Sequence, residues 1–398
     1  MTLKIGIYGG SFNPPHLGHL AAARAAVRAL GLEKLVWIPA GEPPHKVLPA
    51  GSPTPEQRLA MTEIAADQLL LPDITEVWDL ELRREGKSYT SDTLAQAKER
   101  WPDDELWLLV GTDMFRTLQD WHEPERVLSL ANIGAFGRSK ADSAEGLAMQ
   151  KAFLHETYGA NVEIITIPNL VDISSTRLRE MLAAEQGRDF LPHAVYGYIL
   201  RERLYGTERD LTKLSLDDLR CVSYSMVHAK RLAHIRGTEE EAVRLARRWG
   251  ADEDRMRRAA ILHDCTKYLS HEEHLAICDR YGVELEPLER VTDKLLHAKS
   301  GAALAKYVFG QDDIYDAILY HTTARGGMSL EEKLLYIADY MEPNRSFPGV
   351  EELRRLAYSD LDGAVHMGTG LSIQEMIERK REIHHDTQEA HDQYLPRA

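Results

Sequence analysis

Two histidines in the first half of the chain stand where a phosphate could bind. His16 and His19 lie three residues apart at the expected start of a helix. They follow an apolar run at residues 3–8, which predicts a buried strand, and the turn at Gly9 and Gly10, where the backbone can come close to a ligand. Because a helix begins with free N–H groups and the positive end of its dipole, this order predicts an anion site. The imidazoles would add donors for a phosphate whose charge is changing.

Two further stretches of the first half carry groups suited to phosphate. Lys46 ends the loop at residues 37–46, whose prolines exclude helix, and a lysine acts there as a point charge. The run at residues 173–179 opens a helix after the last expected strand, and its hydroxyls and N–H groups can cradle a triphosphate. The groups of this run are Ser174, Ser175, Thr176 and Arg179.

The second half places histidines and aspartates inside or beside apolar helical runs. His263 and Asp264 end one such run, and His321 ends another. Burying ionisable groups without partners is costly, so their repetition implies compensation, of which metal coordination is one form. Mixed imidazole and carboxylate ligands suit Fe, Mn, Zn or Co rather than Ca. The six candidates are His234, His263, Asp264, His297, His321 and Asp339.

Alternating strands and helices must position the groups of the first half. This alternation implies a parallel sheet with helices on both faces, and ligands of such folds bind at the carboxyl ends of the strands. Gly111 and Asp113 also follow a strand, where they suit a ribose or a metal-bound nucleotide. Expected strands cover residues 3–8, 35–39, 75–80, 106–110, 133–136 and 162–167, and expected helices cover 17–31, 55–70, 91–100, 146–158 and 192–204.

Strand patterns vanish near residue 207, so the second half is expected to be all-α. The chain of 398 residues is too long for one ordinary core. We predict a first domain at residues 1–206, a linker at 207–215 and a second domain at 216–398. Expected helices of the second domain cover residues 216–235, 239–249, 253–262, 271–281, 299–308, 312–320, 330–341 and 350–359, with another from 361 onward.

Charge and cysteine content narrow the classes of partner. The net charge of −15 argues against broad binding to nucleic acid or an anionic membrane, and no run approaches membrane-spanning length. Three cysteines without a Cys-x-x-Cys pair favour a reducing, cytoplasmic location. The sequence leaves a homo-oligomer open.

The run His16-Leu-Gly-His19 resembles the His-x-Gly-His signature of the nucleotidylyltransferase superfamily, and the run before it resembles the nicotinate-mononucleotide adenylyltransferase branch. Ile173 through Arg179 resembles the same superfamily's Ile-Ser-Ser-Thr-x-x-Arg motif. The resemblance implies a Rossmann-like domain that binds ATP with Mg²⁺, and nicotinate mononucleotide. It implies nucleotide contacts at Gly9, Gly10, Ser11, Phe12, His16, His19, Gly111, Asp113, Ser174, Ser175, Thr176 and Arg179.

The same resemblance implies where the mononucleotide binds. The backbone of Tyr89 and Thr90 would donate to the nicotinate carboxylate, and Trp121 would stack on the pyridine ring. The family often has Arg-Pro-Gly after the fifth strand, where this chain has Phe136-Gly-Arg-Ser139, which leaves the role of Arg138 open. The implied substrate contacts are His45, Lys46, Tyr89, Thr90, Trp121 and Arg138.

The implied reaction gives deamido-NAD and pyrophosphate. The mononucleotide phosphate is already ionised, so no general base is required and catalysis rests on positioning and charge stabilisation. His16, His19, Lys46 and Arg179 are assigned to that stabilisation. Nicotinamide mononucleotide or phosphopantetheine are alternative acceptors.

The adjacent pair His263-Asp264 resembles the HD phosphohydrolase superfamily. Several runs, among them Leu262-His-Asp-Cys-Thr-Lys267, resemble the bacterial HD-domain symmetrical diadenosine tetraphosphate hydrolases. The resemblance implies ligands at His234, His263, Asp264 and Asp339, with His297 and His321 holding a second metal. His228 is rejected in favour of His234 because its spacing to the following run is wrong.

The expected reaction of this domain converts diadenosine tetraphosphate and water into two ADP. Asp264 is essential to it, iron is the preferred metal, and Mn, Co or Zn are alternatives. Lys267, Arg325 and Arg345 would steady the polyphosphate. The domain could instead act on another nucleotide or serve as a metal-bearing sensor. The histidines of residues 382–391 are expected to belong to a polar terminal helix that frays in solvent.

Overall fold

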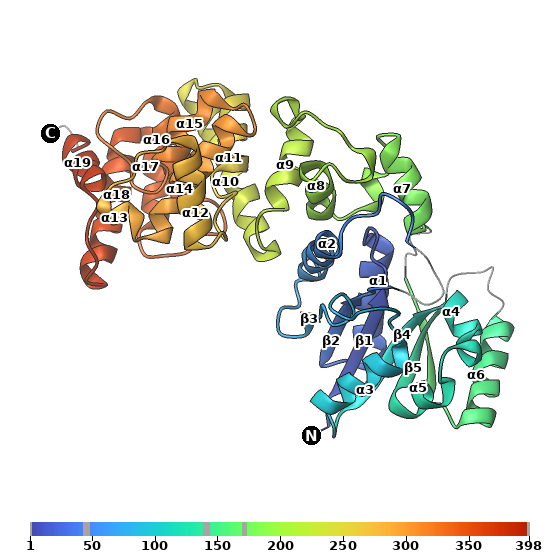
Figure 1. Ribbon diagram of the computed structural model, residues 1–398. Helices are drawn as coiled ribbons and strands as arrows, with labels where there is room; N and C mark the ends of the chain where they lie inside the picture. The colour runs from blue at the N-terminus through green and yellow to red at the C-terminus, as the bar shows by residue number, and fades with distance from the viewer. Residues whose placement is uncertain (1, 43–47, 138–143, 169–172, 396–398) are drawn as a thin grey trace. The chain divides into compact units, whose positions relative to one another are not determined.

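The chain divides into two compact units, Met1–Glu208 and Arg209–Ala398. A computed structural model describes residues 2–42, 48–137, 144–168 and 173–395 (Figure 1). No helix in these ranges is both long and apolar enough to cross a bilayer.

The first unit is built on a parallel sheet of six strands. Its strand order is β3-β2-β1-β4-β5-β6, and in the register Ile7 lies between Val36 and Leu108. These strand centres are almost fully buried and form one core. The strands are β1 (Lys4–Gly10), β2 (Lys34–Pro39), β3 (Thr75–Val77), β4 (Glu105–Gly111), β5 (Asn132–Gly137) and β6 (Val162–Thr166).

Helices connect the strands and pack on the sheet (Figure 1). The order of the strands reverses between β1 and β4, and in open α/β sheets this switch point is where ligands bind. The expected α/β class is confirmed. The helices are α1 (Leu17–Leu30), α2 (Pro55–Asp67), α3 (Thr90–Arg100), α4 (Thr112–Arg116), α5 (Pro124–Leu130), α6 (Ala144–Tyr158), α7 (Ser175–Ala183) and α8 (His193–Arg201), with single 3₁₀ turns η1 (Leu118–Asp120), η2 (Arg188–Phe190) and η3 (Leu204–Gly206).

The second unit is helical throughout its described residues, which confirms the expected all-α class. Its longest helices bury one apolar face each, as α10 does with Ile235, Ala242 and Leu245. The helices are α9 (Leu216–Tyr224), α10 (Leu232–Trp249), α11 (Glu253–Leu262), α12 (His271–Tyr281), α13 (Pro287–Arg290), α14 (Asp293–Tyr307), α15 (Tyr315–Leu319), α16 (Leu330–Met341), α17 (Val350–Ser359), α18 (Leu361–Glu378) and α19 (His385–Gln393), with 3₁₀ turns η4 (Leu211–Lys213), η5 (Ala229–Arg231) and η6 (Asp312–Ile314).

Several expected boundaries are wrong, and three examples show why. The break expected at residues 236–238 lies earlier, between α9 and η5, because α10 runs through Gly237 without interruption. Helix α14 begins six residues before the expected position 299, so His297 lies on it. Strand β3 ends at Val77, because the chain turns at Asp79 rather than staying extended to residue 80.

The expected fraying of the last helix is also wrong. Helix α19 packs against α18 and buries Thr387 and Ala390 on one face, and Tyr394 follows on the same side. These positions recur at helical spacing, so the segment has an inner face that its polar composition conceals.

Candidate active sites

The loop after β1 brings both N-terminal histidines to the start of α1. His16 occupies the N-cap position, and its backbone N–H donates to Nδ1 of His19 at 3.1 Å. The two rings lie with their centroids 3.8 Å apart. The loop therefore presents two imidazoles beside a helix N-terminus, as the spacing of His16 and His19 predicts.

Helix α7 meets the same loop although it comes 160 residues later in the chain. The guanidinium of Arg179 donates to the carbonyl oxygen of Asn13 at 2.7 Å, and the hydroxyl of Ser175 donates to that of Pro14 at 3.3 Å. Ser174 caps α7 by accepting the N–H of Arg177, and Thr176 accepts a hydrogen bond from Arg179 at 3.1 Å. The start of α7 and the loop that leads into α1 thus form one surface rich in N–H and cationic donors.

A cavity of about 490 Å³ opens at the carboxyl ends of β1 and β4. It lies at the switch point of the sheet, and its wall is mainly apolar with a few convergent polar groups, as in small-molecule sites. Seven residues predicted for the site line it, namely Gly9, Gly10, Ser11, Tyr89, Thr90, Gly111 and Trp121.

Two predicted residues point elsewhere. Phe12 is buried, and its ring packs against Tyr8 and Trp37. Asp113 lies exposed in the first turn of α4, two residues beyond Gly111, the end of the strand that lines the cavity. His45, Lys46 and Arg138 lie outside the described residues.

Several residues of this site carry no signal that the sequence analysis used. Arg58 is 1% exposed, and its Nη1 donates to the carbonyl oxygens of Ser11 and Ala40 at 3.2 and 2.6 Å. An arginine on the inner side of the helical pattern at residues 55–67 is the sign that could have found it. The phenol of Tyr205 donates to Oδ1 of Asn13 at 2.7 Å, so the end of the first unit also supports the loop.

Glu81 and His122 complete the wall beside the expected nicotinate pocket. Burial raises the pKa of Glu81, whose carboxylate accepts a hydrogen bond from the Thr93 hydroxyl at 2.7 Å. The His122 ring lies 4.1 Å from that of Tyr89, centroid to centroid. These contacts fix the start of α3, where Tyr89 and Thr90 face the cavity.

In the second unit, three helices bring four of the predicted ligands together. His234 comes from α10, His263 and Asp264 from the end of α11, and Asp339 from α16. The Nε2 atom of His234 lies 3.2 Å from that of His263 and 3.0 Å from Oδ1 of Asp339. Oδ2 of Asp264 lies 3.6 Å from His234 Nε2 and 3.4 Å from His263 Nε2.

The other oxygen of Asp264 faces a second group. Its Oδ1 atom lies 3.2 Å from Nε2 of His297 and 4.0 Å from Nε2 of His321, and the two imidazoles are 3.2 Å apart. All three side chains are buried. One carboxylate therefore stands between two sets of donors, as two neighbouring metal ions would require.

Hydrogen bonds at Nδ1 orient these imidazoles so that Nε2 points toward the space between the donor atoms. Nδ1 of His263 lies 2.7 Å from the carbonyl oxygen of Ala260, and Nδ1 of His321 lies 2.7 Å from that of Ile318. A carbonyl can only accept, so Nδ1 carries a proton in both rings and Nε2 is the nitrogen that faces inward, where a metal ion could replace any proton on it.

A carboxylate holds the third ring in the same way. Nδ1 of His234 lies 3.2 Å from Oε1 of the buried Glu342, whose other oxygen accepts hydrogen bonds from the backbone and side chain of Asn344. Glu342 is not among the residues predicted for this site. A carboxylate three residues after the predicted ligand Asp339 is the sign that could have found it.

The donors fit a transition-metal ion. Ligands about 2.0–2.2 Å from an ion and at right angles to each other lie about 3 Å apart. The first donor set, with separations of 3.0 to 3.7 Å, is close to that geometry. Imidazole nitrogens with carboxylate oxygens suit Fe, Mn, Co or Zn, so the chemistry of the set agrees with its geometry.

The two donor sets, here called the cluster, contain imidazoles and carboxylates that shift the pKa values of one another. Burial alone would raise the pKa of Asp264 and Asp339, but the neighbouring imidazoles hold the pKa of both carboxyls well below the usual range. Burial opposes the charged form of His263 as well, yet the two carboxylates raise its pKa to about 9. Burial beside other imidazoles instead lowers the pKa of His321.

A cavity of about 550 Å³, here called the basic cavity, adjoins the cluster. It is lined by His297, His321 and Asp339 and by four cations, Arg231, Lys267, Lys294 and Arg345. The guanidinium of Arg231, to which the sequence analysis assigned no role, donates to Asp264 at 2.6 Å. Lys267 and Arg345 lie where a polyphosphate could contact both them and the cluster.

Arg325 is not brought to this cavity. Its guanidinium lies 2.7 Å from the buried carboxylate of Glu332 and stacks on Tyr320, 4.1 Å from the ring centre. His228 also lies apart from the donor set and contacts the ring of Tyr268, as its rejection as a ligand implied.

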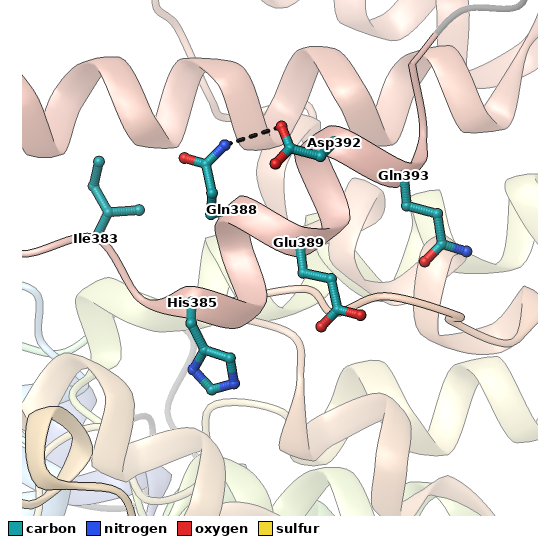
Figure 2. A pocket seen from close by; sticks show the side chains of 6 residues that line it. All are labelled: Ile383, His385, Gln388, Glu389, Asp392 and Gln393. Atoms are coloured by element: carbon teal, nitrogen blue, oxygen red, sulfur yellow. Dashed lines mark hydrogen bonds between the residues drawn. The ribbon is translucent and has the colours of Figure 1, made fainter.

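Helix α19 carries a histidine cluster and an open hollow. Figure 2 shows the hollow, whose wall includes His385 and Glu389, with Gln388 hydrogen-bonded to Asp392 at 3.0 Å. His384 lies among carboxylates but accepts the N–H of Asp386 at Nδ1, so its proton sits on Nε2, the atom that would face a metal. This tautomer argues against a metal there.

Comparison with known proteins agrees with two units of different class. Residues 7–181 match the cytidylyltransferase-like family and residues 231–344 match the HD domain family, so a nucleotidyltransferase-type unit precedes an HD unit. Through its first half the chain belongs to the nicotinate-nucleotide adenylyltransferase family. An HD domain suggests a divalent metal, and the donor groups above fit one.

Each of three similar proteins covers one half of the chain. A probable nicotinate-nucleotide adenylyltransferase of Lachnoclostridium phytofermentans is 38% identical over 204 residues, which are 51% of this chain and 98% of that protein. Another, from Desulfitobacterium hafniense, is 38% identical over 203 residues and 95% of its length. A crystal structure described as a predicted HD superfamily hydrolase involved in NAD metabolism, from Clostridium acetobutylicum, is 39% identical, covers 46% of this chain and 97% of that one, and has a TM-score of 0.44.

Proposed function

We propose that the first unit transfers the adenylyl group of ATP to nicotinate mononucleotide, giving deamido-NAD and pyrophosphate. The observation that carries this proposal is the cavity at the switch point, where the glycine turn of β1 meets Tyr89, Thr90 and Trp121. The relatives named above bear the same activity in their names.

In this reaction the phosphate oxygen of the mononucleotide attacks the α-phosphorus of ATP, and the bond to pyrophosphate breaks. His16, His19, Arg179 and the N–H groups at the starts of α1 and α7 stabilise the charge that moves to the leaving group. Lys46 is proposed to join them. Mg²⁺ bound with ATP would neutralise part of the same charge.

The test is adenylyl transfer by His19→Ala, with deamido-NAD measured directly. We expect turnover to fall by at least about a hundredfold, the usual effect of losing one transition-state donor. His155→Ala, an exposed histidine of α6, is the matched control. Unchanged turnover in the His19 variant, with its fold intact, would refute the assignment. Nicotinamide mononucleotide offered in parallel tests the alternative acceptor.

We propose that the second unit hydrolyses diadenosine tetraphosphate to two ADP. The observation that carries this proposal is the pair of donor groups that share Asp264 beside the basic cavity. Bound metal ions would supply Lewis acidity and an activated water. Arg231, Lys267 and Arg345 hold and orient the phosphates, and burial, which lowers the pKa of Lys267, strengthens its attraction for them while it stays protonated.

The experiment adds diadenosine tetraphosphate, a signalling nucleotide or a deoxynucleoside triphosphate to protein loaded with Fe²⁺ or Mn²⁺. We expect ADP as the sole product of the first compound. A metal-bearing sensor would bind the dinucleotide without turnover, and another phosphohydrolase would prefer one of the other compounds. Metal content measured in the same samples distinguishes iron from Mn, Co and Zn.

A link between the two activities follows from their shared chemistry. An adenylyltransferase can make dinucleoside polyphosphates as side products, and we propose that the second unit removes them in the cytoplasm. Kinetics of the separated units that equal those of the full chain would exclude a functional coupling.

A further inference from the structure

A second cavity of about 490 Å³, here called the side compartment, lies next to the basic cavity. It is bounded by the turn between α13 and α14, the residues after α15, α18 and the segment that leads into α19. The two cavities share Lys294, Thr322 and Ser372 in their walls, so they adjoin each other. Thr322 directly follows His321, which places the shared wall beside the metal cluster.

The side compartment offers both an apolar face and unused hydrogen-bonding capacity. Its apolar lining residues include Leu288, Leu295, Met376 and Ile383. Thr323 is 1% exposed and lines the compartment, and its hydroxyl has no hydrogen-bond partner among the described residues. The hydroxyl of Thr322 is likewise buried without a partner there.

A buried hydroxyl without a partner costs free energy unless something else fills its need. A ligand with a flat apolar face and polar edges would meet both the wall and the hydroxyls. Lys294 and Arg381, both exposed at the border, would lie near the phosphates attached to such a ligand. A nucleoside that carries phosphate has these properties.

We propose that the side compartment binds the second nucleoside of a dinucleoside polyphosphate, whose first nucleoside occupies the basic cavity. The polyphosphate then passes the cluster at its middle, which is the bond that must break to release two equal halves. Both cavities fall within the range of about 300–1,000 Å³ usual for small ligands. This inference rests on the hydrolase function proposed above and specifies how the substrate lies.

The test compares diadenosine tetraphosphate with adenosine tetraphosphate, which lacks one nucleoside, on the full metal-loaded chain. Cleavage of the first yields two ADP, and cleavage of the second yields ADP and pyrophosphate. The ratio compared is kcat/KM for diadenosine tetraphosphate divided by kcat/KM for adenosine tetraphosphate. Met376→Trp fills the compartment, and we expect it to lower this ratio at least about tenfold, because one base contact is lost. Ile377→Trp, an exposed neighbour on α18, should leave the ratio unchanged.

Thr323→Val is the second variant, and it serves if Met376→Trp fails to fold, because valine has nearly the same shape as threonine. It should lower the ratio about fivefold. A ratio near one in the unaltered chain, or one that neither variant changes while metal content and helicity stay normal, would overturn the inference and leave the hydrolase function standing. No ADP from either compound would instead remove the hydrolase function, and this inference with it.

Discussion

Gly237→Ala should weaken metal binding although alanine is the better helix former. Gly237 lies inside α10, one turn after His234. A Cβ atom added there would stand 2.3 Å from Oε2 of Glu342 and 2.9 Å from Nδ2 of Asn344. Glu342 is 1% exposed, so its carboxylate has little room to move without leaving the His234 ring.

The expected size of the effect follows from these distances. An ordinary contact requires a shift of about 1 Å, which would stretch the 3.2 Å contact between Glu342 and Nδ1 of His234 beyond hydrogen-bond length. Loss of such an outer partner typically costs 10–100-fold in metal affinity, or about 1.4–2.8 kcal/mol. Alanine has a helix propensity about 1 kcal/mol better than that of glycine, but this gain stabilises the fold and cannot restore the orientation of the His234 ring.

The assay is a calorimetric titration of chelator-treated protein with Co²⁺ or Mn²⁺. It is carried out on the wild type, Gly237→Ala, Glu342→Ala and the double variant, which together form a double-mutant cycle. Glu342→Ala removes the obstructed carboxylate, so adding Gly237→Ala to it should cost little more. The double variant should therefore bind metal as weakly as Glu342→Ala alone. Wild-type affinity in Gly237→Ala, or losses in the two single variants that simply add, would refute the reasoning.

Three other outcomes are expected. Asp264→Ala should lose metal and hydrolysis together, and full activity with metal retained would contradict the shared carboxylate. Arg58→Met should lower the stability of the first unit by about 3 kcal/mol, because two backbone carbonyls lose the charged donor that the buried Arg58 supplies, and an unchanged unfolding midpoint would disprove this. Burial lowers the pKa of His274 from 6.5 to about 4, so the neutral ring is favoured in the folded state. Its contribution to the free energy of unfolding is therefore complete above pH 6.5 and is lost as the pH falls toward 4. Between pH 6.5 and 4, the free energy of unfolding in urea should fall by about 3 kcal/mol less in a His274→Gln variant than in the wild type. Equal losses would show that the imidazole is not held in its neutral form.

The fold class and the grouping of the candidate metal ligands could be predicted because each depends on a local pattern. Strands alternate with helices in the first half, and the ligands of the second unit sit at the ends of apolar helical runs. The distances in the cluster could not be predicted, since they depend on how α10, α11, α14 and α16 pack.

Residues that act through others left weaker signals. Glu342 orients His234, and Arg58 holds the carbonyls of Ser11 and Ala40, but their only signs in the sequence are a place shortly after Asp339 and a place on the inner side of a helical pattern. Arg325 shows the opposite case, because a basic residue near a matched histidine is paired with Glu332 instead of facing the cavity. Burial and pairing decide these roles, and both are properties of the packed chain.

The bond from Tyr205 to Asn13 determines where the chain can be divided for study. Tyr205 belongs to the last turn of the first unit, 192 residues after the loop that it supports. A fragment that stops at the end of α7 or α8 would keep His16 and His19 yet lose a brace of the loop that carries them. Low activity in such a fragment would report a missing support rather than dependence on the partner unit, so the cut belongs after Thr207.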